Sequence, residues 1–250
     1  MGEMVPSALA QQMMTFLDCP CTYFSPVKDD EILQKAYKKA LQQGKETGFT
    51  PVLVKVDDIL FDCLLMNSDT ENEADYDMAQ VHRYRQTLLT TVLPDGASYL
   101  QNMIQSYQQE LAKEDIDWTE ILGEMKDGLS IDSFSCFWEY GADATAEVIL
   151  AQIPTTNPWE IFAWLPMGNW NDCPDALQMM AVAKYWFTAF GAVPAALSHD
   201  ELEFYMEKPV ITEEDAQKLA LEQYAFCPDR VEQCEEDGSV GKLADTLRQS

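Results

Sequence analysis

Three residues in the C-terminal third carry side chains capable of acid–base or nucleophilic chemistry: Cys173, His199 and Asp200. An imidazole beside a carboxylate can accept a proton from a thiol, provided that the thiol lies within hydrogen-bond reach of the ring. A His-Asp pair is also typical of a turn between two strands, because Asp bonds its own backbone there. A thiol- or acid/base-based hydrolase using Cys173, His199 and Asp200 is therefore one of two functional hypotheses.

Seven cysteines are scattered along the chain, at positions 19, 21, 63, 136, 173, 227 and 234. Cys173-Pro174, Cys227-Pro228 and Cys19-Pro20-Cys21 raise the alternative of a metal or redox site. Structural zinc uses two close pairs of ligands, and thioredoxin-type chemistry uses two cysteines separated by two residues. Neither pattern occurs, so we expect free thiols, no metal site, no disulfide and no cofactor.

No established catalytic or phosphate-binding motif is present. Gly168 stands alone in the sequence MGNW, without the further glycines or the Lys-Ser/Thr pair that cradle phosphate. The GxSxG and HExxH motifs are also absent. Enzymes that depend on these motifs are therefore excluded.

The charge is strongly one-sided: 43 acidic residues against 16 basic ones give a formal net charge of -27. Such a field repels nucleic acid and anionic membranes and attracts cations or basic proteins. Aromatic side chains help nucleic-acid binding only beside a basic track, which the chain lacks. The remaining choice is between binding of a basic protein and an acidic surface that serves solubility alone.

The second functional hypothesis is an acidic protein-binding module, of which an immunity or antitoxin-like protein is one concrete form. Trp170 lies in a loop, where it can anchor a partner while carboxylates steer the approach. The predicted contact residues are Trp170, Asp172, Asp175, Asp200, Glu201 and Glu203.

Periodicity predicts an α+β protein, with a C-terminal module ordered β-α-α-β-β-α packed with a more helical N-terminal half that contains a short strand. The expected helices cover residues 7–17, 30–43, 78–92, 100–111, 118–125, 158–165, 175–190 and 213–224, and the expected strands cover residues 51–56, 147–153, 192–197 and 202–207. Residues 59–66 fit either a strand or a helix. The predicted boundaries are 1–143, 144–230 and a loose polar tail over 231–250.

We expect the dense core in the C-terminal module, with Trp186 and Tyr224 buried, because both share helical spacing with apolar residues. The apolar run over 179–197 is not expected to span a membrane, since Lys184, Gly191 and Pro194 interrupt it. No secretory signal is recognised at the N-terminus, so we expect a cytoplasmic protein.

The C-terminal part contains a series of motifs in a fixed order. They are Pro158-Trp159, residues 165–174 (LPMGNWNDCP), Tyr185-Trp186, Gly191-Ala192, Asp200 to Leu202 and residues 222–229 (EQYAFCPD). In these motifs the run from 147 to 230 resembles a bacterial family, domain of unknown function 4253. Residues 50–53 (TPVL) are similar to the variable region that precedes the domain in such proteins. The resemblance implies an architecture and no activity.

Overall fold

A computed structural model describes residues 5–68, 76–115, 117–171, 173–233 and 238–249. Contacts divide the chain into two compact units, each of which draws on several segments. Unit 1 consists of residues 1–93, 133–187 and 192–205, and unit 2 of residues 94–132, 188–191 and 206–250. Within the described ranges no helix has the length and apolar character needed to cross a membrane.

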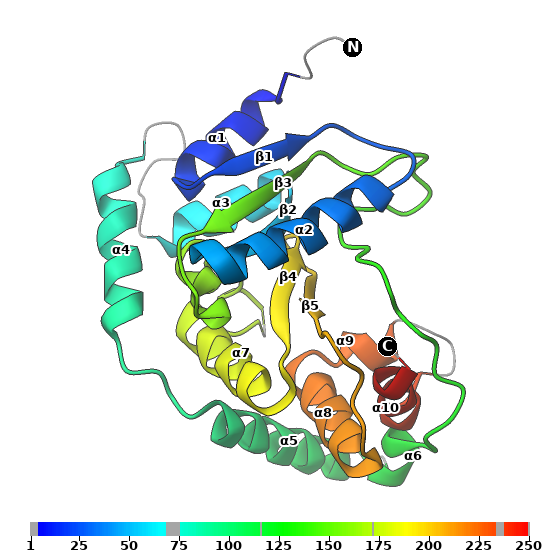
Figure 1. Cartoon of the computed structure of the whole chain (residues 1–250). Coiled ribbons are helices and arrows are strands. Elements are labelled where there is room, and N and C mark those ends of the chain that lie inside the picture. Colours follow the sequence, from blue (N-terminus) through cyan, green and yellow to red (C-terminus); the bar gives the residue numbers. More distant parts are fainter. Residues whose placement is uncertain (1–4, 69–75, 116, 172, 234–237, 250) are drawn as a thin grey trace. The chain divides into compact units, whose positions relative to one another are not determined.

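Unit 1 contains the sheet (Figure 1). Its elements in chain order are α1 (Ala8–Leu17), β1 (Cys21–Phe24), α2 (Glu31–Thr47), β2 (Thr50–Lys55), α3 (Asp58–Asn67), α4 (Met78–Thr90), β3 (Val148–Ile153), the 3₁₀ helix η1 (Pro158–Ala163), most of α7 (Ala176–Phe190), β4 (Val193–Leu197) and β5 (Leu202–Tyr205). The α+β prediction is thereby confirmed, and residues 59–66 form a helix.

The five strands form one mixed sheet in the order β1-β3-β2-β4-β5. β2 pairs with β3 in the antiparallel sense and with β4 in the parallel sense. Leu53 of β2 lies opposite Ala196 of β4, so the carboxyl ends of these two strands meet at one edge of the sheet. That edge positions the candidate site described below.

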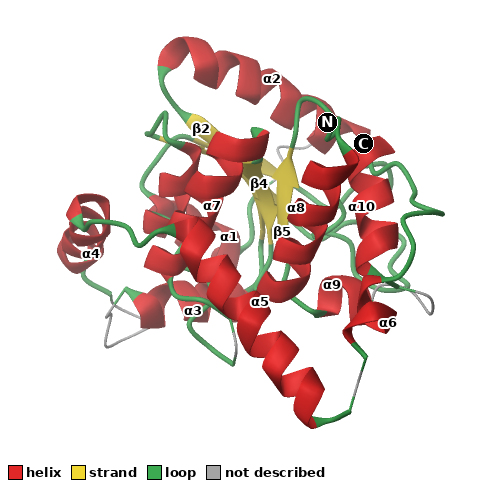
Figure 2. Ribbon diagram, turned by 90° about the horizontal axis from the view of Figure 1, so that it is seen from below, coloured by secondary structure: helices red, strands yellow, loops and turns green. Residues whose placement is uncertain are grey.

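Both faces of the sheet are covered, because successive side chains of a strand point to opposite sides. Leu53 and Leu150 belong to a buried cluster with Leu33 and Tyr37 of α2. Figure 2 shows α2 on one side of the strands and α1 and α3 on the other. The core of unit 1 therefore draws on segments from both halves of the chain, and the expectation that it lies in the C-terminal module is corrected.

Unit 2 is a helical cluster of α5 (Gly96–Lys113), α6 (Trp118–Leu122), α8 (Glu213–Phe226), α9 (Asp229–Glu232) and α10 (Val240–Gln249). Tyr224 of α8 is 1% exposed and contacts the rings of Tyr107 and Trp118. In unit 1, Trp186 is 3% exposed and packs edge-on against Phe204. The burial of Trp186 and Tyr224 is confirmed.

The expected loose tail is wrong. Val240, Leu243 and Ala244 are buried on α10, which packs against α8. Their spacing, with Leu247 one turn further, is the apolar pattern of a helix face, which the polar composition of the segment obscured. The proposed boundaries after residues 143 and 230 stay predictions, although the two units do not follow them.

Candidate functional site

The carboxyl edge of the parallel β2–β4 pair brings together residues that are far apart in the sequence. β2 ends at Lys55 and is followed by Asp57, and β4 ends at Leu197 and is followed by His199. In open sheets with parallel strands, loops beyond the carboxyl ends of the strands commonly bind ligands. We therefore take this edge as the candidate functional site.

Asp57 and His199 form the central contact of the site. Nδ1 of His199 lies 2.6 Å from Oδ2 of Asp57, whose side chain is only 7% exposed. The second carboxylate oxygen, Oδ1, accepts a hydrogen bond from the amide of Leu60 at 3.0 Å and so caps α3. Because a carboxylate only accepts, the proton between the two side chains belongs to Nδ1. The contact fixes the ring and leaves Nε2 as its second functional atom.

An open cavity of about 310 Å³ lies beside this pair. Its lining combines an apolar part, including Leu9, Val56 and the half-exposed Ile59, with the charged groups of Lys55, Asp57, Asp58, Glu139 and His199. Nζ of Lys55 lies 3.5 Å from Oε1 of Glu139. The carboxylates of Asp57, Asp58 and Glu139 outnumber the one lysine, so the rim of the cavity is negatively charged. The turn between β4 and β5 adds further acids to this rim.

The turn between β4 and β5 adds Asp200 and Glu201, followed on β5 by Glu203. Asp200 accepts a hydrogen bond from the hydroxyl of Ser198 at 2.7 Å and lies 3.5 Å from Nδ1 of His199. Burial, followed by the charges of Glu203 and Asp200, raises the pKa of Glu201. Among the described residues, the Glu201 carboxylate makes no hydrogen bond or ion pair. It is therefore the acid of this turn that is available to a ligand.

Glu203, in contrast, is occupied within the protein. Its carboxylate accepts hydrogen bonds from the backbone amides of Ser135 and Cys136 and from the Ser135 hydroxyl, at 2.9–3.2 Å. These contacts hold the segment before β3 against β5. Of the predicted contact residues, Glu203 thus has a role in the fold that its sequence position does not reveal.

Two of the other predicted contact residues, Trp170 and Asp175, lie in the segment before α7. Trp170 is 36% exposed there, and Asp175 caps α7 by accepting from the amide of Gln178 at 2.9 Å. Asp172 lies outside the described residues. Gly168 has φ +89°, and a Cβ atom would come within 2.3 Å of the Pro174 carbonyl oxygen, so the loop requires glycine at this position.

Cys173 and His199 are not hydrogen-bonded to each other. Asp57, the contact of His199, precedes α3, whereas Asn67 at the other end of α3 donates to the carbonyl oxygens of Pro166 and Gly168 in the Cys173 loop. A helix of 10 residues is roughly 15 Å long. The structure therefore brings His199, Asp200 and Glu201 together and leaves Trp170, Cys173 and Asp175 at the far end of α3.

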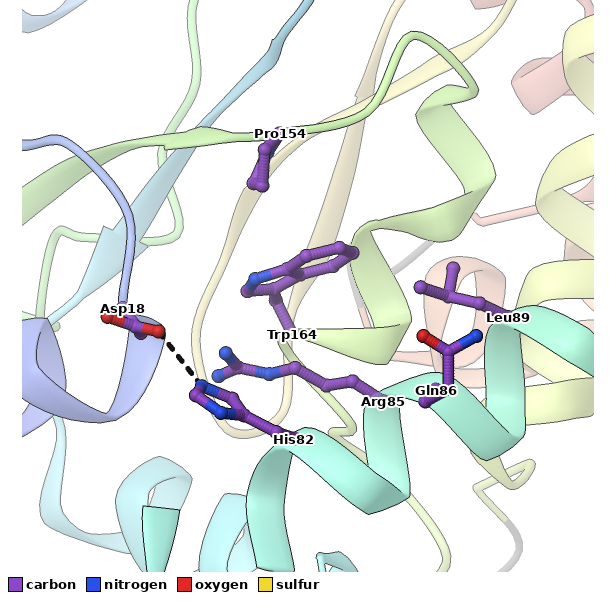
Figure 3. A pocket seen from close by; sticks show the side chains of 7 residues that line it. All are labelled: Asp18, His82, Arg85, Gln86, Leu89, Pro154 and Trp164. Carbon is purple, nitrogen blue, oxygen red and sulfur yellow. Dashed lines mark hydrogen bonds and ion pairs between the residues drawn. The ribbon is translucent and has the colours of Figure 1, made fainter. Parts of the chain in front are cut away.

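A second cavity, of about 280 Å³, lies between α1, α4 and η1 (Figure 3). Figure 3 shows the guanidinium of Arg85 beneath the ring of Trp164, next to the contact between His82 and Asp18. Arg85 is 5% exposed, and its Nη2 donates to the carbonyl oxygen of Phe16 at 2.5 Å. This cavity is thus lined by a buried cation, in a chain that is otherwise strongly acidic.

Sequence reasoning missed Asp57, Lys55 and Glu139 as members of the site. The available signal was Asp57 itself, an acid directly after a buried strand and before a helix. Across the ranges that the structure describes, no cluster of three or more His, Cys, Asp or Glu side chains is arranged to hold a metal ion.

A family model described as domain of unknown function, DUF4253, matches residues 149–250. The matched region begins within β3 and includes His199 and α10, whereas Asp57 and Lys55 precede it. Comparison with curated proteins and with solved structures finds no significant match. The candidate site is accordingly shared between the matched region and the segment before it.

Proposed function

We propose that this chain is an acidic binding module of the bacterial cytoplasm that engages a basic protein through the carboxyl edge of β2 and β4. The observation that carries the proposal is the set of carboxylates around the open cavity, namely Asp57, Asp58, Glu139, Asp200 and Glu201. A lysine or arginine side chain of the partner fits this combination, since its apolar stem suits Ile59 and Val56 and its charge suits the rim.

Glu201 gives the proposal a second argument. Burial, followed by the charges of Glu203 and Asp200, raises the pKa of its carboxyl group, and Lys55 and His199 oppose this effect less strongly. A carboxylate with too little counter-charge beside it destabilises a fold. Such an arrangement is typical of a site whose counter-charge arrives with the ligand.

A role that neutralises a cationic protein, as in an immunity or antitoxin-like protein, is one concrete form of this function. The acidic field would steer the partner at long range and speed its association, and it would lose this effect as salt screens it beyond about 8 Å at physiological ionic strength. The fit at the cavity would then set the rate of dissociation.

The test is binding of a fluorescent lysine-rich peptide, measured by anisotropy at low and high salt. We expect Glu201→Lys and Asp58→Lys to weaken binding more than Glu46→Lys, which makes the same charge change at an exposed position of α2. Glu46 lies near the start of β2, and the strand's six residues separate it from the site by roughly 20 Å. Equal losses in all three variants would mean that net charge alone attracts the peptide, and the localised site would be refuted.

Acid–base catalysis is the second candidate function, favoured specifically by the contact of 2.6 Å between Asp57 and His199. A buried carboxylate that holds Nδ1 prepares Nε2 to accept a proton. In this form Asp57 orients the imidazole, and Cys173 is not required. A screen of ester and amide substrates should then show turnover that His199→Gln abolishes and Cys173→Ser retains; no turnover with any substrate class would leave only the binding role.

A further inference from the structure

The second cavity adjoins a pair of thiols that the proposed function does not use. Cys19 and Cys21 flank Pro20 at the junction of α1 and β1, and both are partly exposed. The two thiols interact with each other, and each shifts the pKa of the other. Cys19 and Cys21 are therefore an interacting pair of thiols, whereas the other cysteines are widely spaced along the sequence.

The backbone holds these two thiols in place. Pro20 has a fixed φ, and its carbonyl oxygen accepts a hydrogen bond from the amide of Gln152 on β3 at 2.9 Å. Cys21 pairs with Ala151 in the sheet. In a fully extended chain, the Cα atoms of residues two positions apart are at most about 7 Å from each other. In disulfides the two Cα atoms are usually about 4.4–6.8 Å apart. The spacing of the two cysteines therefore permits a disulfide.

A buried cation lies beside the pair. On α4, Arg85 donates to the carbonyl oxygen of Phe16 at 2.5 Å, and His82 lies 2.9 Å from the carboxylate of Asp18. Both contacts fix α4 against residues within three positions of Cys19. The Arg85 guanidinium also lies between the rings of Phe16 and Trp164, at 5.4 and 5.5 Å from their centroids.

The charge of Arg85 is only partly balanced by carboxylates: Asp18 lies at the same cavity and favours the charged form without forming an ion pair with it. Within the part of the chain that the structure describes, no acid forms an ion pair with Arg85, and its buried Nε has no hydrogen-bond partner. Burial lowers the pKa of Arg85 to about 10, and Cys19 is the neighbour that opposes this most. A buried cation without an ion pair is costly, so a thiolate at Cys19 stabilises both groups.

We propose that Cys19 and Cys21 are a redox-active thiol pair that is oxidised to a disulfide by a hydroperoxide, with Cys19 as the attacking sulfur. The interaction with Cys21, followed by the Gln152 amide and Arg85, lowers the pKa of Cys19, against the effects of burial and of Asp18. The contact with Cys19, together with burial, raises the pKa of Cys21, which keeps its proton. The two thiols are therefore unequal, since the pKa of Cys19 is lowered and that of Cys21 is raised.

The reaction balances in two steps. The Cys19 thiolate attacks an oxygen of the hydroperoxide, so that an S–O bond forms, the O–O bond breaks and an alcohol leaves after taking a proton from water. The sulfur of Cys21 then attacks that of Cys19, so that the S–S bond forms, the S–O bond breaks and water leaves with the proton of Cys21. Two thiols are oxidised by two electrons, and one hydroperoxide is reduced. A dithiol restores the pair by thiol–disulfide exchange.

The experiment treats the full reduced chain with one equivalent of hydrogen peroxide at pH 7, followed by alkylation in denaturant and peptide mapping. The free thiols should fall from seven to five, with the disulfide between Cys19 and Cys21. An ordinary thiol is only a few per cent ionised at pH 7. Because the pKa of Cys19 is lowered, a larger share of this thiol is ionised at pH 7, and it should react about tenfold faster than the exposed Cys227.

Variants separate the two sulfurs. Cys21→Ser should stop the reaction at a sulfenic acid on Cys19, trapped by dimedone, whereas Cys227→Ser should leave the rate unchanged. Arg85→Met should slow the first step. Because that variant removes a buried side chain and could fail to fold, the pH dependence of iodoacetamide alkylation is also measured in the unmodified chain. The midpoint for Cys19 should lie below that for Cys227.

Two results would overturn the proposal. One is oxidation of Cys227 or another cysteine as fast as Cys19. The other is an alkylation midpoint of Cys19 equal to or above that of Cys227.

Discussion

Replacing Asp57 by alanine removes two interactions at once, and replacing it by asparagine removes part of one. The Asp57 carboxylate caps α3 through the Leu60 amide and holds Nδ1 of His199. Asparagine caps a helix about as well as aspartate, so the Asp57→Asn variant keeps the cap and loses only the charge.

The expected magnitudes follow from this division. An N-cap contributes about 1 kcal/mol. A hydrogen bond to a charged group contributes about 1.5–3 kcal/mol, and a neutral one about 1 kcal/mol. The side chain of His199 is 23% exposed, so water can reach the ring after truncation, and the lower value applies. Asp57→Ala should therefore cost about 2.5 kcal/mol and Asp57→Asn about 0.5 kcal/mol of unfolding free energy.

Urea unfolding monitored by tryptophan fluorescence measures both costs, and two-dimensional NMR of the imidazole nitrogens reports the tautomer of His199. The proton should reside on Nδ1 in the wild-type protein when the ring is neutral and shift toward Nε2 in Asp57→Ala. Equal destabilisation by the two substitutions would refute the division between cap and charge. An unchanged tautomer would show that Asp57 does not control the ring.

Three further predictions concern other parts of the chain. Because the pKa of Glu201 is raised in the folded state, its contribution to stability is present below the unfolded pKa of about 4 and is lost as the pH rises through the folded value. Glu201→Gln should therefore raise the urea midpoint at pH 7, lose this gain near pH 4 and weaken peptide binding; a stabilisation independent of pH would contradict the reasoning. Trp186→Ala should cost about 3–5 kcal/mol, since the side chain is 3% exposed, and an unchanged midpoint would show that it is not a core residue. Gly168→Ala should lower the unfolding free energy more than Gly141→Ala in the same measurement. Both glycines have positive φ, which costs alanine about 1–2 kcal/mol, but only at position 168 would the new Cβ atom clash with a carbonyl oxygen, that of Pro174.

Much of the fold was predictable because its elements carry local signals. Apolar residues at helical spacing located α7, and Thr212 with its following acids located the start of α8, where its hydroxyl oxygen accepts from the Asp215 amide at 3.1 Å. β1 was missed because four residues are too short for an alternating pattern to emerge. The position of β2 between β3 and β4 was not predictable either, since strand order depends on contacts between distant segments.

Only half of the candidate site was predictable from the sequence. His199 and Asp200 stand out as a pair within the sequence, but Asp57 lies 142 residues away from His199, and only the parallel pairing of β2 with β4 brings them together. Glu203 looks like a surface acid in the sequence, and the amides that bind it belong to a segment with no regular pattern. The sequence shows which side chains could take part in a site, whereas the pairing of the strands determines which of those side chains lie next to each other.

The place of β2 in the sheet also has a consequence for biosynthesis. A ribosome releases β1 and β2 well before β3, β4 and β5 exist, so both edges of β2 stay unpaired until the distant strands emerge. An unpaired apolar strand is a template for aggregation, and the nascent N-terminal half should therefore depend on chaperones or on its flanking helices for protection. The same arrangement constrains the region that matches the family: β3 and β4 do not touch without a strand between them. In this chain the gap is filled by β2, which precedes the matched residues 149–250, so the matched region depends on a segment outside it to complete the sheet.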